Sequence, residues 1–503
     1  MGDKTRAKLK DEGGTTLVLV ASLMVVMIGM VGFSADLGWL YYQQTNARKA
    51  AESAALAGVV NMPNLGSWGS GQPAYDTAID VAAAAGYTSG VTPTLIAGKD
   101  YQLQVFVDTT TPTFFMRLFG ISTVAIQENA IAEALPPLRL GSDESNLGND
   151  PTRGIWKGFW LAVNGNAMAK GQGDPFTTLC TGPGSDNSCP ANQDAAPFNP
   201  DYRRPAYYVA FDVPASGNVS FQIYDGQVNG GGNADDRNDD DPTNFASNSN
   251  SDVMDVTFRV FQPDATPADP SDNNTPVAGC VKTYHNELDP GGGWDSGLED
   301  TWDTVCTAAA NAGIYVMSVD VRGFSGDLNG YAVRALVGGS ASNSVAVYGL
   351  GAMSIWNTGG GWQPGGNVAD FDLMEVTPAY AGEQIIVGLW DVGDLNEAGA
   401  LEFRGSVSAY ECEYRVLDES GNQLVAWRND DGDSFAAQCR LAIGVQEHNN
   451  QWIEVRFNVP DSHTCVGSAC WTSVFYDFAG GAHDRTTWTA KVNGQPVHLL
   501  PSG

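Results

Sequence analysis

Basic residues are scarce in this sequence. Only 26 Lys and Arg stand against 58 Asp and Glu in 503 residues, which gives a formal net charge of −32 at pH 7. Nucleic acids and anionic membrane surfaces repel such a chain, so nucleic acid is excluded as a partner. The acidity favours solubility and leaves room for bound cations, although a solvated acidic surface is the simpler interpretation.

Sequence motifs of common hydrolases are also absent. There is no Gly-x-Ser-x-Gly nucleophile elbow and no pair of histidines separated by three residues. The paired carboxylates of a glycosidase have no fixed spacing to search for among 58 acids. We therefore expect no enzyme and assign no catalytic residue.

Cysteine is missing from the first 179 residues, and the eight cysteines all follow. An even number of cysteines in an exported region indicates disulfides. A zinc site is the alternative, but no two cysteines have the two-residue spacing of zinc knuckles, and only Cys465 has a nearby histidine, His463. The simplest pairing joins neighbours in sequence: Cys180 with Cys189, Cys280 with Cys306, Cys412 with Cys439, and Cys465 with Cys470.

Charged side chains are lacking from residue 15 to residue 35, where the chain is strongly apolar. About twenty helical residues cover the roughly 30 Å hydrocarbon core of a bilayer, so residues 15–35 are predicted to form a transmembrane helix. A cleaved export signal would have a shorter apolar region and a small-residue cleavage site. Here the run continues into the aromatic cluster of Trp39, Tyr41 and Tyr42, which is typical of an interfacial belt.

The charges on either side of this run predict its orientation. Residues 1–14 carry Lys4, Arg6, Lys8 and Lys10, whereas the next bases beyond the run are Arg48 and Lys49. The positive-inside rule then puts residues 1–14 in the cytoplasm as a basic leader. The bulk of the chain is expected to be periplasmic or extracellular.

An α+β region follows the apolar run. Residues 40–60 are rich in alanine and continue the first helix up to Pro63, and residues 74–85 predict a second helix that ends at Gly86. Residues 101–107 alternate as a half-buried strand, residues 123–134 read as a returning strand, and "TPTFFMRLFGIS" between them predicts a short amphipathic helix.

The segments "SADLGWLYYQQTNARKAAESAALAG" and "FFMRLFGISTVAIQENAIAEA" carry a resemblance. Residues 8–135 resemble the TadE/TadG-like pilus-assembly family of the Flp, or tight-adherence, secretion system. The resemblance implies a membrane-anchored, pilin-like component with a variable exported region, and residues 36–138 as a pilin-like domain. It also implies other pilus-assembly or pilin-like membrane subunits as partners. Prepilins cut by the dedicated peptidase carry Glu five residues after the cut, but Leu19 stands there after Gly14, so we expect permanent anchoring.

Four residues near the end of the predicted span are candidates for helix packing: Gly29, Gly32, Asp36 and Gly38. The glycines permit a close approach by a neighbouring helix. Two interpretations of Asp36 stay open, a polar contact to another subunit or the first side chain to reach water.

Beyond Pro137 helical periodicity disappears, and short alternating runs between turn residues predict an all-β region. Its length suits two tandem β-sandwich domains, residues 139–340 and 345–503. Three matched blocks support this division: "NVSFQIYDGQV" with "EQIIVGLWDVGD", "VTFRVFQPDATP" with "CEYRVLDESGNQ", and "VDVRGFSGDLNGYAVRA" with "YDFAGGAHDRTTWTAKV".

Acidic loops in these domains make calcium the one candidate cofactor. Calcium takes six to eight oxygen ligands, which loops rich in Asp, Asn and Gly such as "GGGNADDRNDDDP" and "RNDDGDS" supply. Solvated turns are the alternative, since Asp and Asn bond their own backbone there. The candidate ligands are Asp225, Asp235, Asp236, Asp239, Asp320, Asp327, Asp391, Asp394, Asp431, Asp433, Asp477 and Asp484.

The 13 tryptophans raise a second possible function for the β region, that of a surface adhesin that binds glycan or protein. Flat aromatic rings stack on sugars. Trp390 and Trp488 lie in strand patterns at positions where the repeat has Tyr224 and Tyr331, which favours core packing for those two. Trp362, in "NTGGGWQPGG", is better placed for a surface contact.

Overall fold

The computed structural model describes residues 4–63, 67–142, 144–166, 170–178, 199–224, 254–266, 269–285, 301–323, 328–339, 345–358, 369–392, 398–406, 412–429, 439–445, 447–478, 483–494 and 496–500. The chain forms two compact units. The first contains residues 1–134 together with residues 496–503, and the second contains residues 135–495.

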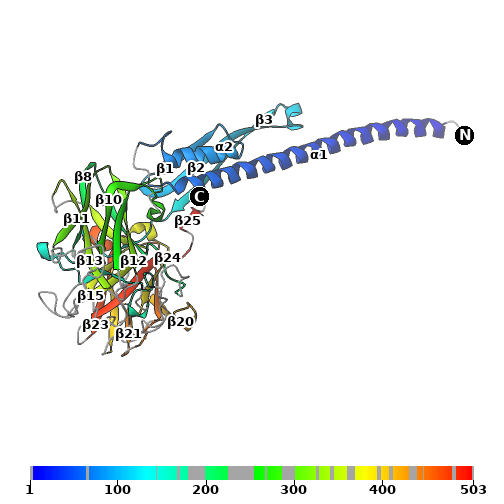
Figure 1. The fold of residues 1–503 in the computed structure, drawn as a ribbon. Coiled ribbons are helices and arrows are strands. Elements are labelled where there is room, and N and C mark those ends of the chain that lie inside the picture. Colours follow the sequence, from blue (N-terminus) through cyan, green and yellow to red (C-terminus); the bar gives the residue numbers. More distant parts are fainter. Residues whose placement is uncertain are drawn as a thin grey trace. The chain divides into compact units, whose positions relative to one another are not determined.

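The first unit is an α+β structure built on one long helix (Figure 1). Helix α1 (Lys4–Val59) packs with helix α2 (Pro73–Ala84) on an antiparallel sheet in the order β1-β2-β3-β25. Its strands are β1 (Val91–Ile96), β2 (Lys99–Pro112), β3 (Thr123–Ala134) and β25 (Val497–Leu500), and the 3-10 helix η1 (Met116–Phe119) joins β2 to β3. The predicted helices and strands are confirmed, except that the short helix is 3-10.

Strand β25 is a difference from the sequence-based division, which assigned residues up to 503 to the second sandwich. Val497 pairs with Ala134 and Leu500 with Ile131, so β25 completes the sheet of the first unit. The chain therefore leaves this sheet after β3 and returns to it about 360 residues later.

Alanines make the helix face that packs on this sheet. Ala47, Ala50, Ala51, Ala54 and Ala55 of α1 are all buried, in one cluster with the inward side chains of β2. These inward side chains are Leu103, Val105 and Val107. Small side chains let the helix backbone lie close to the sheet, as the alanine-rich run predicts.

Gly58 lies where α1 approaches β2 and α2 closely. A Cβ atom there would lie 2.6 Å from Leu103 Cδ2 and 2.8 Å from the carbonyl oxygen of Ala74. We expect Gly58→Ala to destabilise the first unit, because overpacking costs about 1–3 kcal/mol and the gain in helix propensity returns only about 1 kcal/mol. Hydrogen exchange of the α2 amides measures this. Gly38→Ala is the control, since nothing lies within 4 Å of that Cβ position; equal exchange in both variants would contradict the prediction.

The second unit is formed by two long antiparallel sheets (Figure 1). In its described residues, one sheet has the order β10 (Pro276–His285), β9 (Met254–Phe261), β12 (Gly313–Gly323), β7 (Tyr207–Val213), β14 (Ala346–Leu350), β4 (Arg139–Leu140), β16 (Ala369–Glu375), β23 (Trp471–Phe478), β18 (Gly399–Gly405), β21 (Arg440–Ile443). The other has the order β11 (Trp302–Ala310), β8 (Gly217–Tyr224), β13 (Leu328–Val337), β6 (Phe159–Asn164), β15 (Ala352–Thr358), β24 (His483–Val492), β17 (Gln384–Trp390), β22 (Trp452–Asn458), β19 (Cys412–Leu417), β20 (Gln423–Asn429), and β5 (Asn146–Leu147) pairs with β13.

The two predicted sandwich domains are not separate compact units. Strand β14 pairs with β7 and β4, β4 pairs with β16, and β15 pairs with both β6 and β24, so both sheets cross the expected boundary near residue 340. One apolar core cluster likewise contains residues from both halves. Among the described strands, backbone pairing thus runs through the positions where two separate sandwiches would have had sheet edges.

The internal repeat is only partly reproduced in the strand positions. Neighbouring strands β8 and β13 correspond to neighbouring strands β17 and β24, as the first and third matched blocks predict. The middle matched block contains β9 in the first half and β19 in the second half. These two strands are not in equivalent positions, because β9 lies in the sheet that contains β12 and β19 lies in the other sheet. By position beside β12 and β23, β9 corresponds to β18.

Two disulfides join the two sheets at their opposite ends. Cys280 of β10 is bonded to Cys306 of β11, and these are the terminal strands at one end. Cys412 of β19 is bonded to Cys439, which directly precedes β21, near the terminal strands at the other end. Both predicted pairings are confirmed, whereas Cys180 and Cys189 lie outside the described residues.

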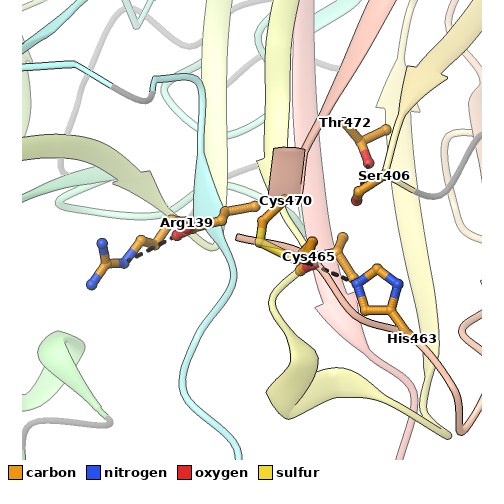
Figure 2. The surroundings of a disulfide bond; sticks show 8 residues. Arg139, Ser406, His463, Cys465, Cys470 and Thr472 are labelled. Carbon is orange, nitrogen blue, oxygen red and sulfur yellow. Dashed lines mark hydrogen bonds and ion pairs between the residues drawn. A yellow bond between two sulfur atoms is a disulfide. The ribbon is translucent and has the colours of Figure 1, made fainter. Parts of the chain in front are cut away.

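The predicted disulfide between Cys465 and Cys470 is local and is also present (Figure 2). It closes a loop that lies just before β23 and includes the 3-10 helix η7 (Gly467–Cys470). The carbonyl of Cys470 accepts a hydrogen bond from the Val376 amide at 2.8 Å, and His463 Nε2 lies 2.8 Å from the Val376 carbonyl oxygen. The loop is thus fixed to the end of β16.

Candidate functional site: the anchor helix

Residues 17–37 of α1 expose a long apolar surface. Helix residues 16–59 are long and apolar enough to cross a membrane. Exposing this apolar surface to water would cost free energy, whereas the hydrocarbon core of a bilayer would cover it. Its exposed large side chains are Leu17, Val18, Leu19, Val20, Leu23, Met24, Val25, Val26, Met27, Ile28, Met30, Val31, Phe33 and Leu37.

Asp36 lies at the end of this surface and binds the β2–β3 connection of its own chain. Its side chain is fully buried. Oδ1 accepts a hydrogen bond from the Phe114 amide at 2.8 Å, and Oδ2 accepts from the amides of Phe115 at 2.8 Å and Met116 at 2.6 Å. The full burial contradicts a first contact with water, and the carboxylate instead satisfies three backbone donors that begin η1 of its own chain. A contact to another subunit stays a prediction.

The three packing glycines have different surroundings. A Cβ atom at Gly32 would lie 2.6 Å from Phe115 Cγ, so this glycine makes room for the β2–β3 connection. Nothing in the chain lies within 4 Å of the Cβ positions of Gly29 and Gly38. Gly38 lies outside the predicted span, so Gly29 is the glycine of these three that is both inside the span and uncovered.

Replacing Asp36 with Asn should loosen the start of η1. Asn has one acceptor oxygen where Asp has two, and it lacks the charge that strengthens the three bonds. We expect the amides of residues 114–116 to exchange with solvent at least about tenfold faster than in the native protein. Hydrogen exchange of the full-length protein measures this rate. Asp76→Asn is the matched control, since that carboxylate accepts from the Gly71 amide elsewhere in the unit. Unchanged exchange in the Asp36 variant would contradict this role.

The described calcium candidates are used for other contacts. Asp320 pairs with Arg204 at 2.9 Å and with Arg322 at 3.2 Å, and Asp477 pairs with Arg440 at 2.8 Å. Asp391 is buried with φ 59° and accepts from the Asn450 amide at 2.6 Å. No group of three or more metal-ligating side chains occurs within the described residues.

The structure does not test the remaining calcium candidates. Residues Asp225, Asp235, Asp236, Asp239, Asp327, Asp394, Asp431 and Asp433 lie outside the described residues, as does the side chain of Asp484. Calcium binding by the acidic loops stays a prediction.

Tryptophans of the second half are mainly core residues. Trp390 and Trp488 are fully buried, as predicted, and Trp356 and Trp471 are each 8% exposed. The Trp390 indole donates to the Lys170 carbonyl at 2.8 Å. These four rings are therefore not available to stack on a sugar, and Trp362 lies outside the described residues.

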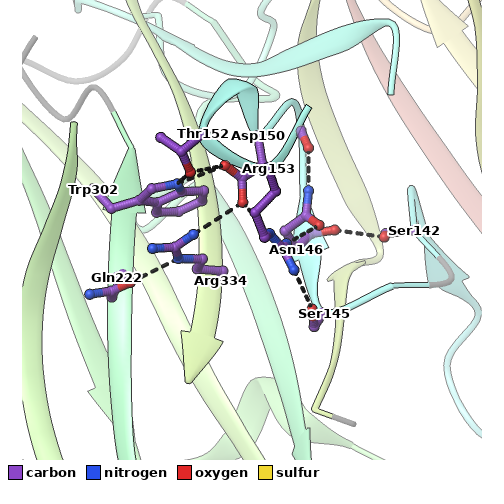
Figure 3. Close-up of polar contacts among 10 residues, drawn as sticks. Ser142, Ser145, Asn146, Asp150, Thr152, Arg153, Gln222, Trp302 and Arg334 are labelled. Atoms are coloured by element: carbon purple, nitrogen blue, oxygen red, sulfur yellow. Dashed lines mark hydrogen bonds and ion pairs between the residues drawn. The ribbon is translucent and has the colours of Figure 1, made fainter. Parts of the chain in front are cut away.

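A buried charge network that the sequence did not reveal centres on Asp150 (Figure 3). Asp150 is fully buried just before the 3-10 helix η2 (Pro151–Arg153). One carboxylate oxygen accepts from Thr152 at 2.5 Å and Trp302 at 2.9 Å; the other accepts from Arg153 at 2.5 Å and Arg334 at 3.1 Å. Burial raises the pKa of this carboxyl, but these hydrogen bonds outweigh it and the pKa ends below its usual value.

An apolar helix that suits a bilayer, followed by an α+β unit and a large β unit, fits a membrane-anchored protein. Residues 13–61 match the family model described as putative Flp pilus-assembly TadE/G-like. This match confirms the predicted resemblance over the helix that forms the anchor. The resemblance of residues 62–135 lies outside the matched segment.

No curated protein matches the chain. Among solved structures, that of infectious bursal disease virus Gx strain is 13% identical to this chain, with a TM-score of 0.10. The match covers 57% of this chain and 62% of the viral chain, which is less than two thirds of the viral chain's length. The VP2 subviral particle of infectious bursal disease virus is 13% identical, covers 71% of this chain and 75% of its own, with a TM-score of 0.11. TM-scores this low bear on neither the fold nor the function.

Proposed function

We propose that this protein is a single-pass, structural component of a Flp pilus-assembly system, held in the cytoplasmic membrane by residues 15–35. The observation that carries the proposal is the family match at residues 13–61, which falls on a helix with a long exposed apolar surface. The basic leader is cytoplasmic, and the two-sheet unit is exported, in agreement with its disulfides.

The partners of the anchor are other membrane helices of the assembly system. The alanine face of α1 already packs on the sheet and helix of its own unit, so it is occupied. The surface left for a partner is the apolar part of α1, where Gly29 is uncovered. Small residues allow helices to approach closely in lipid, which makes this turn the expected contact.

Co-purification from the native membrane tests the proposal. We expect the full-length protein to stay in carbonate-washed membranes and to co-purify with pilus-assembly subunits, and Gly29→Leu to weaken that co-purification. Gly38→Leu, at the equally uncovered glycine outside the span, is the matched control. Release from washed membranes, or a lack of assembly subunits in the purified sample, would contradict the proposal.

The mass of the purified protein tests permanent anchoring separately. Because Leu19 replaces the Glu of processed prepilins, we expect the intact mass to include residues 1–14. A mass that lacks this leader would show processing and would place the protein in the filament instead.

A further inference from the structure

The connection between β2 and β3 exposes a dense group of apolar side chains. We call residues 113–122 the tip. Its exposed large apolar residues are Phe114 (52%), Phe115 (42%), Leu118 (76%), Phe119 (66%) and Ile121 (42%). A contiguous group of this kind at the end of a hairpin indicates a surface that something apolar covers.

The tip is held against the last turns of the predicted span. The Phe119 and Phe33 rings stack with their centroids 5.2 Å apart, and Phe115 occupies the space beside Gly32. Asp36 binds the tip backbone through three hydrogen bonds. Both Gly32 and Phe33 belong to residues 15–35, so the tip lies beside the end of the span and not beyond it.

We propose that the tip is a second membrane contact, inserted among the lipids of the outer leaflet beside α1. This inference rests on the part of the proposed function that has α1 cross the bilayer. A helix rises about 1.5 Å per residue, so the contacts from Gly32 to Asp36 span only about 6 Å along its axis. If the bilayer covers Phe33, it reaches the ring stacked on it as well.

The backbone and charges of the tip suit this position. Irregular backbone at membrane depth needs its polar groups satisfied by protein, and Asp36 satisfies three amides at the start of η1. The exposed Arg117 is the one basic residue of the tip. Its long side chain can place the guanidinium among lipid phosphates while its stem stays apolar.

Lipid is the occupant that the continuity of the surface favours. The exposed Phe119 of the tip stacks on Phe33 of α1, and Phe33 belongs to the apolar surface that the bilayer covers. A helix of another subunit is the competing occupant, and the experiment below separates the two.

The test places an environment-sensitive fluorophore at single cysteines introduced into the full-length, disulfide-bonded protein. Leu118→Cys reports on the tip, Val25→Cys on the span, and Ala97→Cys on the β1–β2 turn, at the opposite end of the long strand β2. Each labelled protein is inserted as a single copy into phosphatidylcholine nanodiscs, so that no second subunit is present. Some nanodiscs contain lipids with a nitroxide quencher near the headgroup end of the acyl chain.

We expect the labels at residues 118 and 25 to be blue-shifted, and the label at residue 118 to be quenched several-fold more by the nitroxide lipid than the label at residue 97. Equal lipid quenching at residues 118 and 97, with residue 25 still in lipid, would overturn the inference and leave the anchor intact. Such a tip would be free for a protein partner. Loss of the lipid signal at residue 25 would overturn both the anchor and the inference.

Discussion

Replacing Asp150 with Asn is expected to lower the free energy of unfolding of the second unit by about 3–5 kcal/mol. The substitution removes the charge that two arginines share, while Arg334 stays largely buried with 12% of its side chain exposed. An unpaired buried cation is costly, and the hydrogen bonds from Thr152 and Trp302 weaken as well. Denaturant unfolding followed by tryptophan fluorescence measures the loss.

Asp212→Asn is the matched control for this prediction. Asp212 also pairs with an arginine, Arg139 at 3.1 Å, but both side chains are about one-third exposed, so this pair contributes at most about 1 kcal/mol. Equal losses in the two variants would show that the Asp150 network does not stabilise the unit.

The contribution of Asp150 should depend on pH in a known direction. Its pKa in the folded protein lies below its usual value, because the hydrogen bonds to the carboxylate outweigh the effect of burial. The stabilisation is therefore fully present above about pH 4 and is lost as the pH falls through the lower, folded pKa. The stability difference between the native protein and Asp150→Asn should narrow in that acidic range.

Removing the disulfide between Cys412 and Cys439 is expected to cost about 3–4 kcal/mol, from the entropy of a closed loop with a sequence separation of 27. The bond joins the two sheets where they end, so amides of β20 and β21 should exchange faster in the double Ala variant. Unfolding of the oxidised protein and hydrogen exchange measure the two effects.

The disulfide between Cys465 and Cys470 supplies the comparison. Its sequence separation is only 5, and the same relation gives about 2 kcal/mol. A larger loss on removing this short loop than on removing Cys412–Cys439 would mean that loop length does not determine the stabilisation.

Local patterns predicted much of the first unit. The alternation of residues 101–107 predicted part of β2, the returning strand expected at residues 123–134 is β3 with the same bounds, and the alanine run predicted the buried face of α1. Both depend on neighbours a few residues apart, which a single sequence contains. Nearest-neighbour pairing of cysteines worked for the same reason, since each described pair is closed by a short segment of chain.

The features that the sequence did not predict depend on contacts between residues far apart in the chain. Asp36 and the amides it binds are about 80 residues apart, and no local pattern links a helix residue to a hairpin connection. Strands β4 and β14, whose pairing helps to join the halves of the second unit, are separated by about 200 residues. A repeat in sequence predicts similar strands, but it does not tell whether their sheets stay separate.

The return of the chain to β25 has a mechanical consequence. Residues 135–495 are connected to the first unit by two backbones, one leaving β3 at Ala134 and one entering β25, where Val497 is paired with that same residue. A pulling force on the second unit is thus divided between two hydrogen-bonded neighbouring strands instead of acting on one linker. A single proteolytic cut before β25 would leave the second unit covalently joined to α1 through β3, whereas a cut after β3 would leave it held only by the pairing of β25 with β3.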